Sequence, residues 1–416
     1  MIMEPDVLEA VTKALEDYFG VEVTINDVQI LSEADRRNRI ARLFLSSGNN
    51  EMQSVIFKHS LSDKTQETND EDILARFARD FAGLKFLGRS DINHSIPKFL
   101  GASQSFRFIL LEDLGDTHIS LVDSLTKSDP DKAIASLKRF TKSLAHFHMA
   151  SYGRLPEYDE LLVSTHPKRE TLEERIKWNE EDLIPKLELV CNRFDIPFTN
   201  EIKQEAIDVI KISLSPGDFY VLTHGDICPD NVFDHEDKDE LQLIDFEWVR
   251  PGSSLLDATY FRMNFPTCWC AKALPESIVD ELESLYRETI ASKIRASLDD
   301  SKYNESYVAA CGFWLLSSMP FALRVMDKDE CWSSGPVPDD SLWKQEENLA
   351  RPRFISRLQA FIKVSKEHNM LPHLRQSAEQ MLAHAYEKWN DARPLDLYPA
   401  FQNSNSKLDV LCPTKP

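Results

Sequence analysis

The chain has 416 residues, of which 42% are hydrophobic and 28% are charged. This length can bury a substantial core, and the composition is ordinary for a globular protein, so most of the chain is expected to fold. The net charge of −21 argues against a nucleic-acid partner or an anionic membrane surface, because either needs a clustered positive face.

The cysteines and the apolar segments indicate in which cellular compartment the protein is expected. There are 7 cysteines, scattered along the chain, and none forms a C-x-x-C pair typical of zinc or redox sites. Cys268 and Cys270 flank Trp269 and are expected to be packing thiols. The N-terminus does not resemble a signal peptide, and the most apolar stretch, residues 312–326, is interrupted by polar residues. We therefore expect a cytoplasmic protein that does not span a membrane.

The first third of the chain mixes helix and strand patterns. Apolar residues at helical spacing predict one helix near the N-terminus and another before residue 90. Between them, alternating patterns and the turn formers SSGNN predict a meander of antiparallel strands. The predicted helices are 6–19 and 72–87, and the predicted strands are 28–31, 39–45, 53–59 and 106–111.

The rest of the chain is predicted to be mainly helical, with a strand and loop region at residues 218–246. The final stretch, residues 391–416, contains four prolines and no sustained period, so we expect a loosely ordered tail. The long periodic segments that predict helices are 132–150, 171–193, 276–296, 305–316, 353–368 and 375–389.

Two short stretches carry the chemistry, THGDICPDN at residues 223–231 and LIDFEW at 243–248. An apolar strand ends before the first stretch, and Pro229 stiffens the following loop so that Asn231 returns near Asp226. Residues 231–234 and 241–245 can then pair as a hairpin, which brings Asp245 beside Asn231. His224 is expected to orient the loop rather than to transfer protons.

Such a set of side chains suits phosphoryl transfer. Amide and carboxylate oxygens from Asn231 and Asp245, completed by phosphate and water, are the ligands that Mg²⁺ prefers. Asp226 is then left to accept a proton, as the base of a kinase does. The alternative interpretation is turn chemistry alone, because Asp and Asn are common in loops.

HGDICPDN followed by IDFE resembles the catalytic and metal-binding loops of the aminoglycoside phosphotransferase and choline kinase group. The resemblance covers about residues 25–262. It implies a protein-kinase-like α+β fold in two lobes, with ATP bound in the cleft between them. The implied lobes are an antiparallel-sheet nucleotide-binding lobe at 1–112 and a mainly helical catalytic and substrate-binding lobe at 113–390, followed by the tail.

The resemblance also assigns roles to residues of the nucleotide-binding lobe. Lys58 is expected to contact the α and β phosphates, with Asp80 on the next helix as its ion-pair partner. The group usually has Glu at that position, so the shorter Asp80 leaves the pairing open and Glu71 is a second candidate. In the glycine-free loop SEADRRN, Ser32 or Asn38 is expected to contact phosphate.

Further positions match the group in the hinge and around the catalytic loop. Glu112 and Leu114 follow the strand FRFILL, where backbone groups of the hinge bind adenine. Glu247 is expected to assist Asn231 and Asp245 in binding Mg²⁺. Asp257 is expected to support the catalytic loop.

The sequence therefore predicts an ATP- and Mg²⁺-dependent kinase that phosphorylates a hydroxyl of a small molecule. Its partner is then a small hydroxylated substrate, with no nucleic acid or membrane, and nothing in the sequence indicates the oligomeric state. Two alternatives stay open, an aminoglycoside or macrolide kinase and a nucleotide-binding pseudokinase. A protein kinase is disfavoured, because no A-P-E segment follows IDFEW.

Overall fold

The computed structural model describes residues 3–32, 38–47, 52–61, 70–90, 95–331 and 348–402. The chain forms two compact units, and both units are discontinuous in sequence. The first comprises Met1–His118, Arg154–Arg169 and Gln242–Val249. The second comprises Ile119–Gly153, Glu170–Leu241 and Arg250–Pro416.

The first unit is built on a five-stranded antiparallel sheet with the strand order β1-β2-β3-β5-β4. The first three strands form the predicted meander, although β1 begins five residues earlier than the apolar pattern indicated. The edge strand β4 was not predicted. The strands are β1 (Val23–Ile30), β2 (Asn38–Ser47), β3 (Ser54–Ser60), β4 (Phe99–Ser103) and β5 (Phe108–Glu112).

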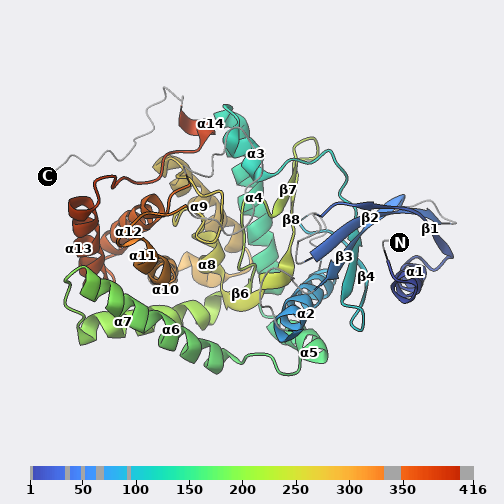
Figure 1. Ribbon diagram of the computed structural model, residues 1–416, viewed down its shortest axis with the longest axis horizontal. Helices are drawn as coiled ribbons and strands as arrows, with labels where there is room; N and C mark the ends of the chain where they lie inside the picture. Colours follow the sequence, from blue (N-terminus) through green and yellow to red (C-terminus); the bar gives the residue numbers. More distant parts are fainter. Residues whose placement is uncertain are drawn as a thin grey trace. The chain divides into compact units, whose positions relative to one another are not determined.

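One face of this sheet is covered by α1 (Pro5–Phe19), which lies beside the strands in Figure 1. Val11 and Leu15 of α1 are one helical turn apart and pack in the same core as Phe57 of β3. Successive side chains of a strand point to opposite faces, so the neighbour of Phe57, Lys58, points away from α1.

The helix α2 (Asp70–Leu87) lies on the side of the sheet to which Lys58 points. It packs against α5 (Leu155–Thr165) and against a short 3-10 helix, η2 (Phe246–Trp248). The approach to η2 is close: a Cβ atom placed on Gly83 would lie 3.0 Å from the Cγ2 atom of Val249. Gly83 therefore allows α2 to lie against the segment that carries Asp245.

The second unit is mainly helical. Its helices pack as neighbours, with α4 against α9 and α10 between α7 and α12, and α6 and α7 lie side by side in Figure 1. The helices are α3 (Leu121–Thr126), α4 (Pro130–Ser151), α6 (Leu172–Arg193), α7 (Asn200–Leu214), α8 (Ser254–Ala258), α9 (Glu276–Ile290), α10 (Asp300–Leu316), α11 (Met319–Val325), α12 (Ala350–Glu367), α13 (Pro372–Lys388) and α14 (Pro399–Gln402).

Two short sheets interrupt the helices. β6 (Tyr220–Thr223) pairs antiparallel with β9 (Arg250–Ser253), and β7 (Val232–His235) pairs with β8 (Glu240–Leu243) in the expected hairpin. The pairing of β6 with β9 joins strands that lie far apart in sequence. No periodicity indicated β9.

Several helix boundaries differ from the sequence-based expectation. The helix expected at 276–296 ends at Ile290, and a separate helix begins at Asp300. Asp299 starts that helix, because its carboxylate accepts hydrogen bonds from the backbone N–H groups of Ser301 and Lys302. The region Asp300–Val325 is apolar and long enough to cross a membrane, but 78% of its most apolar window is buried inside the protein.

The tail was expected to be loosely ordered, and its first part is packed. Tyr398 is fully buried and donates a hydrogen bond to the carbonyl oxygen of Cys270 at 2.6 Å. Phe401 is 2% exposed. Two large aromatic side chains thus hold residues up to Gln402, and residues 403–416 lie outside the described part of the chain.

Candidate active site

The residues selected from the sequence divide between the two units, and most of the nucleotide- and metal-related ones lie in the first. The second unit holds His224, Asp226, Asn231 and Asp257. The first unit holds Ser32, Asn38, Lys58, Asp80, Glu112, Leu114, Asp245 and Glu247.

In the first unit, Lys58 lies between two carboxylates. Its Nζ atom is 2.7 Å from Asp80 Oδ2 and 2.6 Å from Asp245 Oδ1. Asp80 reaches the lysine because it belongs to the buried stripe of α2, one turn after Phe77. Aspartate is thus long enough for this ion pair. Glu71, the other candidate, instead lies 2.7 Å from His166 Nε2.

Burial and the neighbouring charges have opposite effects on the pKa values of Lys58 and Asp80. Burial alone lowers the pKa of Lys58, but the carboxylates of Asp245, Asp80 and Glu247 outweigh it and raise that pKa well above its ordinary value. Burial raises the pKa of Asp80 to about 6, although the Lys58 ammonium acts against this rise. Lys58 is therefore a permanent cation, and Asp80 is a carboxyl that can take up a proton in mildly acidic solution.

The backbone around Asp245 presents its carboxylate to Lys58. Asp245 adopts a left-handed conformation with φ of 67°, and η2 begins directly after it. The helix α2 holds this turn through Arg79, whose Nε atom donates to the carbonyl oxygen of Glu247 at 2.7 Å. The Asp245 side chain is 32% exposed, so it is accessible to an ion or a ligand.

Glu247 and the two residues expected to contact phosphate form contacts within the protein. The Glu247 side chain is buried, and its Oε2 atom accepts from Asn38 Nδ2 at 3.0 Å. Ser32 Oγ accepts from the backbone N–H of Ile40 at 3.0 Å and so closes the β1–β2 hairpin. Residues 33–37, between Ser32 and Asn38, lie outside the described residues.

The predicted hinge is fixed by an arginine that the sequence did not reveal. Arg42 of β2 is buried and forms a two-pronged ion pair with Asp113, through Nε at 2.6 Å and Nη2 at 3.1 Å. Asp113 lies between the predicted residues Glu112 and Leu114. Glu112 Oε2 in turn accepts from the backbone N–H of Lys98 at 3.2 Å. A buried charge in a strand has no periodic signature, so strand patterning could not indicate Arg42.

In the second unit, the stretch after β6 turns sharply and returns on itself. Gly225 has φ of 78°, a left-handed conformation that suits glycine, and the half-buried Asp226 follows. The Nδ2 atom of Asn231 donates to the carbonyl oxygen of Asp226 at 2.9 Å and lies 3.4 Å from its Oδ2 atom. The loop thus places Asn231 beside Asp226, as the short spacing and Pro229 indicated.

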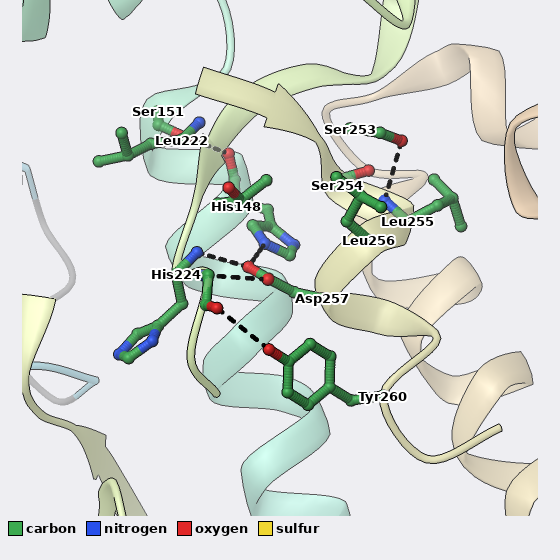
Figure 2. A network of polar contacts seen from close by, with 12 residues as sticks. His148, Ser151, Leu222, His224, Ser253, Ser254, Leu255, Leu256, Asp257 and Tyr260 are labelled. Atoms are coloured by element: carbon green, nitrogen blue, oxygen red, sulfur yellow. Dashed lines mark hydrogen bonds and ion pairs between the residues drawn. The ribbon is translucent and has the colours of Figure 1, made fainter. Parts of the chain in front are cut away.

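Asp257 holds the start of this loop (Figure 2). Its carboxylate is 1% exposed and accepts from the backbone N–H groups of His224, at 2.5 Å, and Gly225, at 3.3 Å. His148 Nε2 lies 3.1 Å from the same carboxylate, and His148 Nδ1 lies 2.7 Å from the hydroxyl of Tyr286. The imidazole of His224 points away from Asp257 in Figure 2, so the contact between these two residues is made by the backbone N–H of His224.

A threonine beside Asp226 was missed. Thr267 Oγ1 donates to Asp226 Oδ1 at 2.6 Å, across 41 residues of sequence. Thr267 lies in the stretch NFPTCW at residues 264–269. Only its neighbour Pro266 and the break in helical periodicity mark this position as a loop.

The interpretation of Cys268 as a packing thiol was wrong. Cys268 forms a disulfide with Cys228 of the loop that follows β6, and the two residues are 40 positions apart. No sequence pattern links cysteines at that separation without the fold. Among the described residues, Cys270 is a free buried thiol, as expected, together with Cys191 and Cys311, and Cys331 is free and exposed.

Oxygen-bearing side chains of the kind selected from the sequence suit a hard cation better than a soft one. Within the described ranges, no group of three or more His, Cys, Asp and Glu side chains is arranged to hold a metal ion. Mg²⁺, however, is commonly bound by one or two protein carboxylates plus substrate phosphates and water. In the first unit, the partly exposed carboxylate of Asp245 is a side chain of that kind.

An antiparallel-sheet unit with a buried lysine–aspartate pair, and a helical unit with an Asp…Asn loop, together define an α+β protein of the kinase-like class. The model of the ecdysteroid kinase-like family matches residues 74–295, more than half of the chain. The protein belongs to that family. This membership agrees with the phosphotransferase resemblance noted in the sequence.

Comparison with solved structures gives distant matches. The choline kinase LicA from Streptococcus pneumoniae is 14% identical, with a TM-score of 0.40 over 87% of this chain and 99% of that one. An ethanolamine kinase from Plasmodium vivax is 14% identical, with a TM-score of 0.43 over 89% and 88%. The amicoumacin kinase hAmiN is 14% identical, with a TM-score of 0.44 over 91% and 94%. No curated protein matches the sequence significantly.

Proposed function

We propose that the protein is a small-molecule kinase, which transfers the γ-phosphoryl group of ATP to a hydroxyl in a Mg²⁺-dependent reaction. The observation that carries the proposal is Lys58, a buried cation held at 2.7 Å from Asp80 and 2.6 Å from Asp245. A lysine on a sheet, paired with a helix carboxylate, is what kinases use to neutralise nucleotide phosphates. Membership of a kinase-like family supports the same class of reaction.

The residues of the first unit would bind and neutralise the donor. Asp80 keeps the Lys58 ammonium in place, and Lys58 offers its positive charge to the α and β phosphate oxygens. Asp245 and Glu247 of this unit would hold Mg²⁺, and Asn231 of the second unit would contribute its side-chain oxygen. When bound, Mg²⁺ supplies neutralisation of the charge that develops on the phosphate oxygens during transfer.

The residues of the second unit would act on the acceptor. Asp226 accepts the proton of the attacking hydroxyl and orients that hydroxyl. Asp257 fixes the loop that carries Asp226, because its buried carboxylate binds the backbone N–H groups of His224 and Gly225. Most of the rate enhancement then comes from positioning and from charge neutralisation.

ADP release from Mg²⁺-ATP tests the proposal. The acceptors are a library of hydroxylated small molecules: amino alcohols, sugars, aminoglycosides, macrolides and, because of the family's name, polyhydroxylated steroids. We expect Asp245→Ala to abolish release with any active acceptor. Asp226→Asn should lose release but keep Mg²⁺-ATP binding in calorimetry. The exposed Asp327→Asn is the control and should behave as the native protein does.

Full activity of Asp245→Ala would contradict the metal assignment. Loss of Mg²⁺-ATP binding in Asp226→Asn would indicate a structural role for Asp226 instead of a catalytic one. Nucleotide binding by the native protein without ADP release from any acceptor would favour a nucleotide-binding module over an enzyme.

A further inference from the structure

The hydroxyl of Thr267 forms a short hydrogen bond to the carboxylate of Asp226, the base of the proposed reaction. The Oγ1–Oδ1 distance is 2.6 Å, and the two residues belong to segments that are 41 positions apart. A carboxylate can only accept, so the threonine donates the proton. Hydrogen bonds to charged groups are among the stronger ones in proteins, so this contact constrains the orientation of the carboxyl group.

A buried tyrosine lies beside the threonine. The hydroxyl of Tyr260 lies 3.3 Å from Thr267 Oγ1 and donates to the carbonyl oxygen of Gly225 at 3.2 Å. Burial raises the pKa of Tyr260 well above its ordinary value, so the phenol stays neutral and remains a donor. Its single proton goes to the carbonyl oxygen of Gly225, so Tyr260 holds the backbone beside Asp226, and the proton of Thr267 goes to the Asp226 carboxylate.

The backbone that carries Thr267 is held by two buried arginines of α12. Arg353 donates to the carbonyl oxygens of Cys268 and Trp269, each at 2.6 Å, and Arg357 donates to that of Pro266 at 2.6 Å. Arg353 is 0% exposed and Arg357 is 4% exposed. Burying a guanidinium group costs free energy unless it is hydrogen-bonded. Here those hydrogen bonds fix the carbonyl groups on both sides of Thr267.

A covalent bond also ties this segment to the catalytic loop. Cys268, the residue after Thr267, is joined to Cys228, which lies two residues after Asp226. The segment before Thr267 is equally constrained, because Asn264 and Phe265 adopt left-handed conformations with φ of 57° and 50°. Thr267 is thus presented to Asp226 by a segment with few ways to move.

We propose that Thr267 is a positioning residue for the base of the phosphoryl transfer, holding one carboxylate oxygen of Asp226 so that the other faces the acceptor hydroxyl. This role rests on the proposed function. It is carried by the hydroxyl group alone, so serine should serve at position 267 and valine, which has nearly the same shape, should not.

The test measures ADP release from Mg²⁺-ATP with water as the acceptor, which needs no knowledge of the natural substrate. Removal of a hydrogen bond to a charged group corresponds to a loss of about tenfold to a hundredfold in rate. We expect Thr267→Val to lose that factor in kcat with KM for Mg²⁺-ATP unchanged, and Thr267→Ser to recover most of it. Thr289→Val is the matched control, because within the described part of the chain its hydroxyl bonds only a carbonyl of its own helix, Leu285 O at 2.6 Å.

A double mutant separates positioning from a general structural effect. If Thr267 acts through Asp226, adding Thr267→Val to Asp226→Asn should change the rate by less than about twofold, because the contact that it removes no longer serves a base. Thr267→Ala provides the same comparison if the valine variant does not fold, with thermal unfolding of each variant as the check.

Three results would overturn this role. The first is a native rate of ADP release in Thr267→Val, and the second is an equal loss of rate in Thr267→Ser and Thr267→Val. The third is a rate in the double mutant that is lower than that of Asp226→Asn by the same factor that Thr267→Val loses alone. Equal ADP release from the native protein and Asp226→Asn would instead reject the proposed function itself, and the role of Thr267 with it.

Discussion

Asp80 combines full burial with a charged partner, and this combination makes its ionisation sensitive to pH. Burial raises its pKa from 3.8 to about 6, against the effect of Lys58. The folded protein therefore binds the Asp80 proton more tightly than the unfolded chain does. Lys58, whose pKa is raised, stays charged over the same range.

The sign of the stability change follows from linkage. An acid with a raised pKa in the folded state adds to the free energy of unfolding as the pH falls from about 6 to about 4. We therefore expect the native protein to gain stability relative to Asp80→Asn over this window. Urea unfolding of both proteins at pH 7, 6, 5 and 4 measures the difference, and a difference that is flat or falls with decreasing pH would contradict the shift.

The buried carboxylate of Asp257 accepts hydrogen bonds from two backbone N–H groups of the proposed catalytic loop, and it contacts the imidazole of His148. Asp257→Asn replaces one acceptor oxygen by a donor that faces other donors. We expect a loss of about 3 kcal/mol in the free energy of unfolding, as for other broken buried pairs. Chemical denaturation measures this loss. Asp327→Asn removes an exposed ion pair with Arg193 and should change stability by less than about 0.5 kcal/mol.

At the scale of elements, the position of Asp245 depends on how closely α2 approaches η2. Gly83 leaves only 3.0 Å between an added Cβ and Val249 Cγ2, and the same turn is bonded by Arg79. The helix thus holds both partners of Lys58: Asp80 directly, and Asp245 through the packing of η2.

We expect Gly83→Val to push α2 and η2 apart. Overpacking of this kind costs about 1–3 kcal/mol, and the displaced Asp245 should weaken Mg²⁺-ATP binding. Calorimetry and chemical denaturation measure the two effects.

Ala75→Val makes the same kind of change at a half-buried position of the same helix. Its cost should be limited to the lower helix propensity of valine, about 0.5 kcal/mol. Equal effects of the two changes would show that the close contact is unimportant.

At the scale of the whole molecule, binding of the donor should stabilise the fold only when the metal and the nucleotide are both present. A ligand that binds only the folded state adds about 2.7 kcal/mol at a concentration one hundred times its Kd. Thermal unfolding with ATP alone, Mg²⁺ alone and both together tests this expectation. In Asp245→Asn the combined effect should disappear, and its persistence would place the metal elsewhere.

The sequence by itself indicated those features that depend on residues close together in the chain. The helix α2, the strands β2 and β3, and the β7–β8 hairpin follow from local periodicity and turn residues. The return of Asn231 to Asp226 follows from a spacing of five residues with a proline between. The family resemblance had the same origin, because its motifs are short stretches in a fixed order.

The tertiary structure alone decided which distant residues meet. The pairing of Lys58 with Asp245 spans 187 positions, the disulfide spans 40, and the contact of Thr267 with Asp226 spans 41. Residues 154–169 and 242–249 likewise join the first unit, although segments of the second unit precede each of them in the sequence. Periodicity indicates which face of a helix or strand is apolar, but many other helices or strands could pack against the same apolar face. The partner is chosen only when the whole core packs and each buried polar group finds its hydrogen bond.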